Sequence, residues 1–170
     1  MQRMNATTLN ALAVFPQQLE AHYAAIPAEF KQWSPSSWEG IPSEPFTAIE
    51  QVCHVHDIEV EGYHLRLQRT LTEFNPILLS IDGEALARER SYATANTDEV
   101  FAAFREARAK TIELISDLSA EQLNRTAEFE GYGPLSVRSL VHYLCSHDQQ
   151  HLAGLQWLLG KIAASCVRLR

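Results

Sequence analysis

The sequence lacks several features that would place the protein in a specialised class. No apolar run is long enough to span a membrane, so no membrane segment is expected. Polar residues and a proline interrupt residues 16–20, so the N-terminus lacks the apolar core of a secretory signal peptide. The three cysteines, Cys53, Cys145 and Cys166, form no Cys-x-x-Cys pair, and their small, odd number favours a reducing cytoplasm over a disulfide framework.

Positive charge is also scarce. The chain has 14 Lys and Arg against 21 Asp and Glu, which gives a formal net charge of −7. A duplex-binding protein needs a concentrated basic surface to displace counterions. Here the basic residues alternate with acidic ones, as in residues 105–110. The composition argues against nucleic acid as a partner, and a small-molecule substrate is expected only from the resemblance described below. The length is that of one domain, so residues 1–170 are expected to fold together.

Hydrophobic periodicity predicts four long helices, at residues 8–26, 47–71, 97–118 and 136–161. Residues 27–46 hold four of the chain's seven prolines, together with two tryptophans, which predicts a long loop held by aromatic contacts. A crossover with a short helix near residues 84–90 is expected between the second and third helices. No strand is expected, and residues 124–135 are predicted to be a loop. The pattern predicts an all-α fold, a four-helix bundle with long connections.

The last predicted helix has an interruption in its apolar stripe. At His147 and His151, imidazoles stand where apolar side chains would continue the pattern. Residues four apart lie on the same side of a helix, so both rings can point at one ion. Burying two histidines is unfavourable unless each finds a partner. A divalent metal would satisfy both, and hydrogen bonds to a neighbouring helix would be the alternative. A third ligand from another helix would decide for the metal.

The helix at 47–71 offers three histidines as the third ligand. His56 falls on its main apolar stripe and His54 on a second, narrower one, so spacing leaves these two equally good, with His64 third. Two other kinds of metal site lack necessary residues. The His-Glu-x-x-His metalloprotease motif would need glutamate where Asp148 stands. The di-iron bundle would need glutamates on the last helix, which has none.

Two segments together resemble the DinB/YfiT-like superfamily of metalloenzymes: CHVHDIE at residues 53–59 and HDQQHLAGLQ at residues 147–156. Proteins of that superfamily are bundles that bind a metal through one histidine of the second helix and two from a His-x-x-x-His pair on the last. The second-helix pattern, a histidine followed three and five residues later by acids, is matched by His54, Asp57 and Glu59. The resemblance extends over most of the chain in helix order, and it implies His54 as the third ligand beside His147 and His151.

Three neutral imidazoles suit Zn²⁺ or Ni²⁺ and leave a coordination position open for water or substrate. Asp57 and Asp148 are expected to orient the imidazoles by accepting their second N–H. The remaining catalytic candidates are Glu61, as a base facing the ion, and Asp82, Arg88 and Tyr92, which could reach the open side of the metal from the crossover.

The resemblance implies a metal-dependent enzyme. Characterised members of the superfamily include isomerases and S-transferases that use a low-molecular-weight thiol such as mycothiol or bacillithiol, and metal-assisted hydrolysis is the nearest enzymatic alternative. The hypothesis from a different class is a non-catalytic bundle that binds a metal for stability or sensing, or that serves as an interaction module. The resemblance also implies a homodimer.

Overall fold

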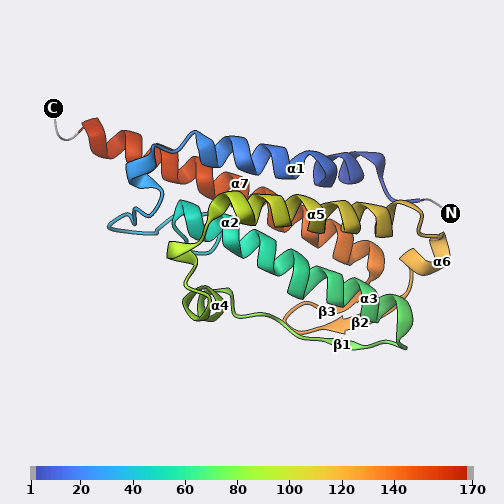
Figure 1. Cartoon of the computed structure of the whole chain (residues 1–170). Helices are drawn as coiled ribbons and strands as arrows, with labels where there is room; N and C mark the ends of the chain where they lie inside the picture. The colour runs from blue at the N-terminus through green and yellow to red at the C-terminus, as the bar shows by residue number, and fades with distance from the viewer. Residues whose placement is uncertain (1–2, 168–170) are drawn as a thin grey trace.

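The computed structural model of the protein describes residues 3–167, and the side chains of residues 3–165. Four long helical segments pack side by side in it (Figure 1). They are α1 (Ala6–Ala24), the continuous run of α2 (Ala48–Asp57), η2 (Ile58–His64) and α3 (Leu65–Thr72), α5 (Thr97–Ser116) and α7 (Val137–Val167). The predicted all-α bundle is confirmed. The predicted helix ends agree to within two residues, except that α7 continues past Lys161 to Val167.

The two long connections pack against the bundle. The loop between α1 and α2 contains the single turn η1 (Ala28–Phe30), and its Trp38 stacks on Trp157 of α7 with ring centroids 5.9 Å apart. The crossover from α3 to α5 contains β1 (Ile77–Leu78), α4 (Gly83–Glu89) and η3 (Tyr92–Thr94). Both the loop held by aromatic contacts and the short crossover helix are therefore present as expected. No helix in the described part of the chain is long and apolar enough to cross a membrane.

A small sheet corrects the expectation that the chain has no strand. After the short helix α6 (Ala120–Leu123), β2 (Thr126–Phe129) and β3 (Gly133–Ser136) form an antiparallel hairpin. β1 pairs with β2 in parallel, which gives the order β1-β2-β3. Each strand has only two to four residues. So short a strand carries too little alternation of polar and apolar residues to be recognised in a sequence.

The second long helix changes its winding in the middle. Ile58–His64 is a π-helix, whose wider turns rotate the side chains that follow it away from the positions expected of an α-helix. Val60 and Leu65, both expected to face inward, are 39% and 52% exposed. Glu59 and Arg66 are buried instead. The π-helix therefore explains why apolar spacing gave no clear answer for the histidines of this helix.

Pro16 lies inside α1 and allows a hydrogen bond between α1 and α5. Proline has no N–H, so the carbonyl four residues earlier, that of Leu12, loses its helical donor. Nη1 of Arg108 on α5 donates to this carbonyl at 2.9 Å. The proline thus provides a free acceptor in the core, and a buried arginine uses it.

Candidate metal centre

Three histidines and one glutamate converge between the second and last helices. His54 comes from α2, His147 and His151 from α7, and Glu44 from the loop before α2. Nε2 of His147 is 3.3 Å from Nε2 of His54 and 3.1 Å from Nε2 of His151. The Glu44 carboxylate is 3.5 Å from Nε2 of His54 and 3.4 Å from Nε2 of His151. One ligand atom from each residue lies within 4.8 Å of all the others. We call these four residues the His–Glu cluster.

The spacing in the His–Glu cluster fits metal coordination better than hydrogen bonding. A neutral imidazole has one donor and one acceptor nitrogen, so three Nε2 atoms that face one another cannot all be paired. Protonation does not solve this, because burial and the neighbouring imidazoles lower the pKa of His147 to about 3 and that of His151 well below its usual value. Around a tetrahedral zinc ion with Zn–N distances of about 2.0–2.1 Å, ligand atoms lie about 3.3 Å apart. The two separations between imidazole nitrogens, 3.3 and 3.1 Å, are close to that value. The two Glu44 distances are also close to it, each through a different carboxylate oxygen.

Gln51 fixes two members of the cluster. Its Nε2 donates to Ser43 Oγ at 2.8 Å and so holds the loop that carries Glu44. Its Oε1 accepts a hydrogen bond from Nδ1 of His151. This bond places the ring proton on Nδ1, which leaves the Nε2 lone pair pointing into the cluster, as a metal ligand requires. Gly154 of α7 permits the contact, because a Cβ there would lie 2.5 Å from Ser43 Oγ.

Packing against Phe46 and Gly83 holds the ring of His54 in place. Its ring lies 5.0 Å from that of Phe46, centroid to centroid. On the other side is Gly83, the first residue of α4, where a Cβ would be only 2.5 Å from His54 Cε1. Glycine is needed where a backbone approaches a side chain so closely. Nδ1 of His54 is buried and has no hydrogen-bond partner among the described residues.

Glu44 and His147 form the accessible side of the cluster. The Glu44 side chain is 40% exposed, and His147 is half-buried, whereas His54 and His151 are buried. Burial would raise the pKa of Glu44, but its interactions with the neighbouring imidazoles outweigh this and lower the pKa to about 2. Glu44 is therefore an anion at neutral pH, on the more exposed side of the cluster.

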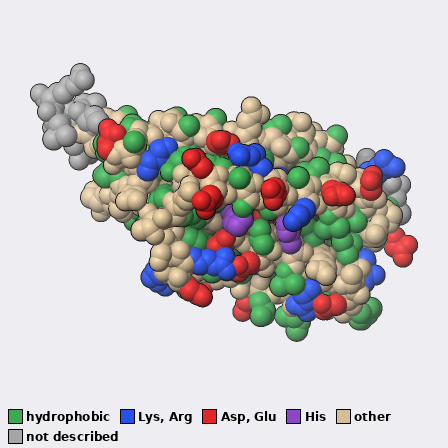
Figure 2. Space-filling model, viewed as in Figure 1, with side chains coloured by type: hydrophobic (Ala, Val, Ile, Leu, Met, Phe, Trp, Pro, Cys, Tyr) green, Lys and Arg blue, Asp and Glu red, His purple; other side chains and the backbone are tan. Residues whose placement is uncertain are grey.

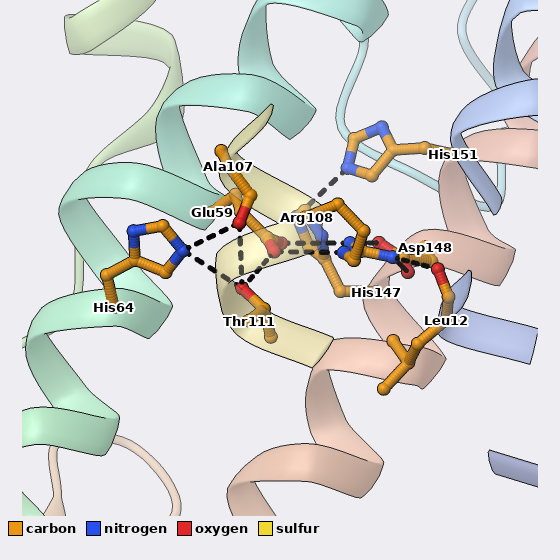
Figure 3. Close-up of polar contacts among 9 residues, drawn as sticks. All are labelled: Leu12, Glu59, His64, Ala107, Arg108, Thr111, His147, Asp148 and His151. Atoms are coloured by element: carbon orange, nitrogen blue, oxygen red, sulfur yellow. Dashed lines mark hydrogen bonds and ion pairs between the residues drawn. The ribbon is translucent and has the colours of Figure 1, made fainter. Parts of the chain in front are cut away.

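Asp148, expected to orient an imidazole, binds an arginine instead. Arg108 donates to both carboxylate oxygens of Asp148, at 2.7 and 3.0 Å, and to both of Glu59, at 2.9 Å each. Figure 3 shows Arg108 between the two carboxylates. All three side chains are buried. Asp148 therefore anchors α7 between the two cluster histidines, and it affects them through the helix backbone.

His64, the weakest of the three candidates for the third ligand, belongs to the same set of contacts (Figure 3). Its Nε2 donates to Thr111 Oγ1 at 2.9 Å and to the carbonyl of Ala107 at 3.1 Å. Thr111 in turn donates to Glu59 Oε1 at 2.5 Å. We call Arg108, Glu59, Asp148, Thr111 and the carbonyl of Leu12 the Arg108 network. His64 serves this network and not the His–Glu cluster.

Asp57 also has a role different from the expected one. Its carboxylate accepts from the Tyr92 hydroxyl at 2.6 Å, from Arg90 at 2.9 Å and from Nδ1 of His56 at 2.9 Å. It therefore fastens the crossover to α2 and does not orient His54. The hydrogen bond with Asp57 keeps His56 outside the His–Glu cluster. On helical spacing alone, His56 and His54 were equally good candidates for the third ligand.

The four catalytic candidates are not at the cluster. Glu61 is exposed and pairs with Arg90, and the Tyr92 hydroxyl is taken by Asp57. Asp82 caps α4 by accepting from the N–H of Ala85, and Arg88 is exposed near Glu84. Within residues 3–165, no hydrogen bond or ion pair joins any of these four candidates to the His–Glu cluster.

Sequence reasoning missed Glu44 and Gln51. Glu44 is an acid in a proline-rich loop, and Gln51 is a polar residue on a helix face, so neither belongs to a motif. One signal was available for Gln51. It lies three residues before His54, on the same side of α2, where an apolar side chain would be expected of a buried helix.

The fold and the cluster together define a class: a bundle of four helices with a set of metal-ligating side chains between its second and last helices. The chain belongs to the DinB superfamily, whose family model matches residues 11–155. Among solved structures it is similar to YfiT from Bacillus subtilis, described as a probable metal-dependent hydrolase with an unusual four-helix bundle topology. The two share 17% sequence identity with a TM-score of 0.81, over 96% of this chain and 92% of YfiT. No match was found among curated proteins.

Proposed function

We propose that the protein is a metal-dependent enzyme of the hydrolase type. Its divalent ion, zinc or nickel, would be held by His54, His147 and His151, with Glu44 as a fourth, anionic ligand. The observation that carries the proposal is the convergence of three imidazoles and one carboxylate, whose ligand atoms all lie within 4.8 Å of one another, with His147 and Glu44 only partly buried. An ion held there would be within reach of a small molecule from solvent.

The metal would supply Lewis acidity, and the side chains determine what surrounds it. Gln51 holds His151 in the tautomer that coordinates, and Gly83 and Phe46 hold the ring of His54. A general base works best with a pKa near the working pH. With a pKa of about 2, Glu44 is a weak base, so we assign it to the metal as a ligand that substrate can displace.

Thiol transfer would need a thiol from outside the chain, because the described cysteines supply no thiolate at the cluster, whereas hydrolysis needs only water as the second reactant. Burial and the nearby Asp57 raise the pKa of Cys53 to about 12, and its Sγ lies 3.9 Å from the carbonyl of Tyr92. The Cys145 thiol also has a raised pKa because of burial. The side chain of Cys166 lies outside the described residues. The description of YfiT as a probable hydrolase supports the same choice, although 17% identity shows a common fold and no more.

Metal content tests the site directly. The protein purified without chelator should carry about one equivalent of Zn or Ni by mass spectrometry, and His54→Ala and His147→Ala should lose it. His56→Ala is the matched control, since His56 lies two residues from His54 but binds Asp57. It should keep its metal. A metal-free native protein, or equal loss in all three variants, would refute the site.

Activity then decides between the reactions. The metal-loaded protein should hydrolyse some members of a panel of esters, amides and lactones, and chelation should abolish the turnover. In the Co²⁺-substituted protein, a thiolate-to-cobalt absorption band on addition of bacillithiol or mycothiol would instead favour thiol transfer. Bound metal with neither response would favour the non-catalytic bundle. The homodimer stays a prediction that sedimentation can check.

A further inference from the structure

Arg66 on α3 is a buried cation without an anion. It is 6% exposed. Its Nη2 donates to the carbonyl of Leu79 at 3.1 Å, and its guanidinium lies over the rings of Phe129 and Tyr63, at 4.5 and 5.4 Å. Nε is buried and has no partner in the described part of the chain. No described carboxylate lies within ion-pair distance of the guanidinium, and burial lowers the pKa of Arg66.

Two other arginines have the carboxylate partner that Arg66 lacks. Arg108, which is also buried, is neutralised by Glu59 and Asp148. Arg69 lies one turn after Arg66 and also donates to a backbone carbonyl, that of Ile77 in β1. It differs in being partly exposed and in pairing with Glu73 at 2.8 Å. A buried charge without a counter-charge is unfavourable, and contacts with aromatic faces compensate it only in part. Arg66 therefore has no paired carboxylate among the described residues, since Glu61, which lines the same cavity as Arg66, pairs with Arg90.

This cavity beside Arg66 has room for a carboxylate. Its volume is about 140 Å³, and its walls are mainly apolar, formed by Leu65, Leu78, Leu79 and Ile81. Its other polar side chains are largely engaged, because Glu61 pairs with Arg90 and Arg69 with Glu73. The volume is well below the roughly 300–1,000 Å³ of sites for drug-sized ligands, so a small ligand fits. On the face drawn in Figure 2, hydrophobic side chains gather toward the lower right, where Figure 1 places α3 and β1.

Gly62 keeps space for the guanidinium. A Cβ at this position would lie 2.8 Å from Nη1 of Arg66 and 3.5 Å from Cδ1 of Ile81. Glycine inside a helix is less favourable than alanine, because it loses more conformational freedom on folding. Its position here, buried in the π-helix, is explained by the room that Arg66 needs next to the cavity.

We propose that this cavity binds a small carboxylate with a short apolar group. The guanidinium of Arg66 would bind the carboxylate, since arginine matches the two oxygens with a planar pair of donors. The leucine and isoleucine walls would contact the apolar group. The proposal does not depend on the metal. The segment that forms one wall continues along the chain to Gly83, which packs beside His54.

Butyrate is a suitable probe, with saturation-transfer NMR on the metal-free and metal-loaded protein as the measurement. A ligand of this size should bind with a Kd on the order of millimolar. Arg66→Met should weaken binding by about tenfold or more, and Arg66→Lys, which keeps the charge and loses the planar donors, should also weaken it. Arg69→Gln is the matched control at the same cavity and should change the Kd by less than about twofold.

Two comparison ligands test the class of ligand. Butylamine has the same chain without the carboxylate, and inorganic phosphate has the charge without the chain. Both should bind more weakly than butyrate. If Arg66→Met does not fold, Arg66→Lys carries the test, because it keeps the aliphatic stem. The proposal is overturned if butyrate shows no saturation, if Arg66→Lys binds it as the native protein does, or if phosphate competes equally well. Loss of metal in the cluster variants with butyrate binding intact would separate this site from the proposed function.

Discussion

Two buried polar clusters lie next to each other along α7 and differ in how they are completed. Asp148 belongs to the Arg108 network, while His147 and His151 belong to the His–Glu cluster. The five N–H groups of Arg108 match five hydrogen bonds, two to Glu59, two to Asp148 and one to the carbonyl of Leu12. The network is complete within the protein. The His–Glu cluster leaves three Nε2 atoms facing one another, which is why we propose that a metal ion from outside the chain completes it.

This difference separates a structural cluster from a binding site. Both clusters are rich in ionisable groups and contain fully buried members, so composition does not distinguish them. The distinguishing property is whether the protein provides partners for every donor and acceptor. By the same criterion the environment of Arg66 belongs with the His–Glu cluster, because its charge has no counter-charge among the described residues.

The largest effect is expected from breaking the completed network. Arg108→Met leaves Glu59 and Asp148 buried without their counter-charge, so the free energy of unfolding should fall by about 3–5 kcal/mol. Chemical denaturation at neutral pH measures this. Arg105→Met is the matched control, one turn away on α5, because Arg105 is half-exposed and pairs with Glu20 at the surface. It should lower the free energy of unfolding by less than about 1 kcal/mol. Similar losses in the two variants would contradict the assignment of the network.

A substitution in the metal-free His–Glu cluster should, in contrast, change the free energy of unfolding very little. In the metal-free protein, His147→Leu removes an imidazole that has no good partner and should change the free energy of unfolding by less than about 1 kcal/mol. With metal at 100 times its Kd, the native protein should gain about 2.7 kcal/mol and the variant nothing. Thermal unfolding with and without chelator measures both values. A loss of several kcal/mol in the metal-free variant would mean that the cluster is completed by the protein alone.

The last helix and its histidine pair were predictable because their signal is local. Residues four apart on one helix meet whatever the rest of the chain does, so His147 and His151 needed no knowledge of the fold. His54 was different. The π-helix that follows it breaks the apolar period of the second helix, and only the resemblance to a family favoured His54 over His56.

Contacts between distant segments could not be predicted in the same way. Glu44 reaches the cluster because Gln51 holds a loop whose path no local rule determines. Arg108 meets Glu59 and Asp148 across 49 and 40 residues of sequence, and the sequence indicated only a charged helix face. Asp57 and Asp148 were expected to serve the imidazoles because they adjoin them in the motifs. In the fold, nearer cations and a tyrosine hydroxyl bind them.

Gly83→Ala should weaken the His–Glu cluster without touching a ligand. The added methyl group would lie 2.5 Å from Cε1 of His54, so the ring must move away from its position. Disturbing the residues that hold a metal ligand in place typically reduces metal affinity. We expect the affinity of Gly83→Ala to fall about tenfold, or by ~1.4 kcal/mol. Competition with a chromogenic chelator measures the change.

Gly160→Ala is the control for this substitution. Gly160 is exposed on α7, and a Cβ added there would meet nothing within 4 Å. The variant should keep native metal affinity and gain up to about 1 kcal/mol in stability, because alanine is favoured over glycine in a helix. Unchanged metal affinity in Gly83→Ala would show that the crossover does not position His54.

The smallest effect concerns Asp57, which fastens the crossover that carries Gly83. Burial would raise its pKa, but hydrogen bonds from His56 and Tyr92 and the charge of Arg90 outweigh this and lower it below the ordinary value of 3.8. A carboxyl whose pKa is lower in the folded than in the unfolded protein stabilises the fold above its unfolded pKa, and this stabilisation is lost as the pH falls through the folded value. Asp57→Asn should therefore be less stable than the native protein by about 1 kcal/mol at pH 7, and the difference should shrink toward pH 3.

Asp117→Asn, an exposed site at the end of α5, should show no such difference at either pH. A difference that stays constant with pH would mean that Asp57 holds the crossover by shape rather than by charge, and the wall around His54 would then be independent of the ionisation of Asp57.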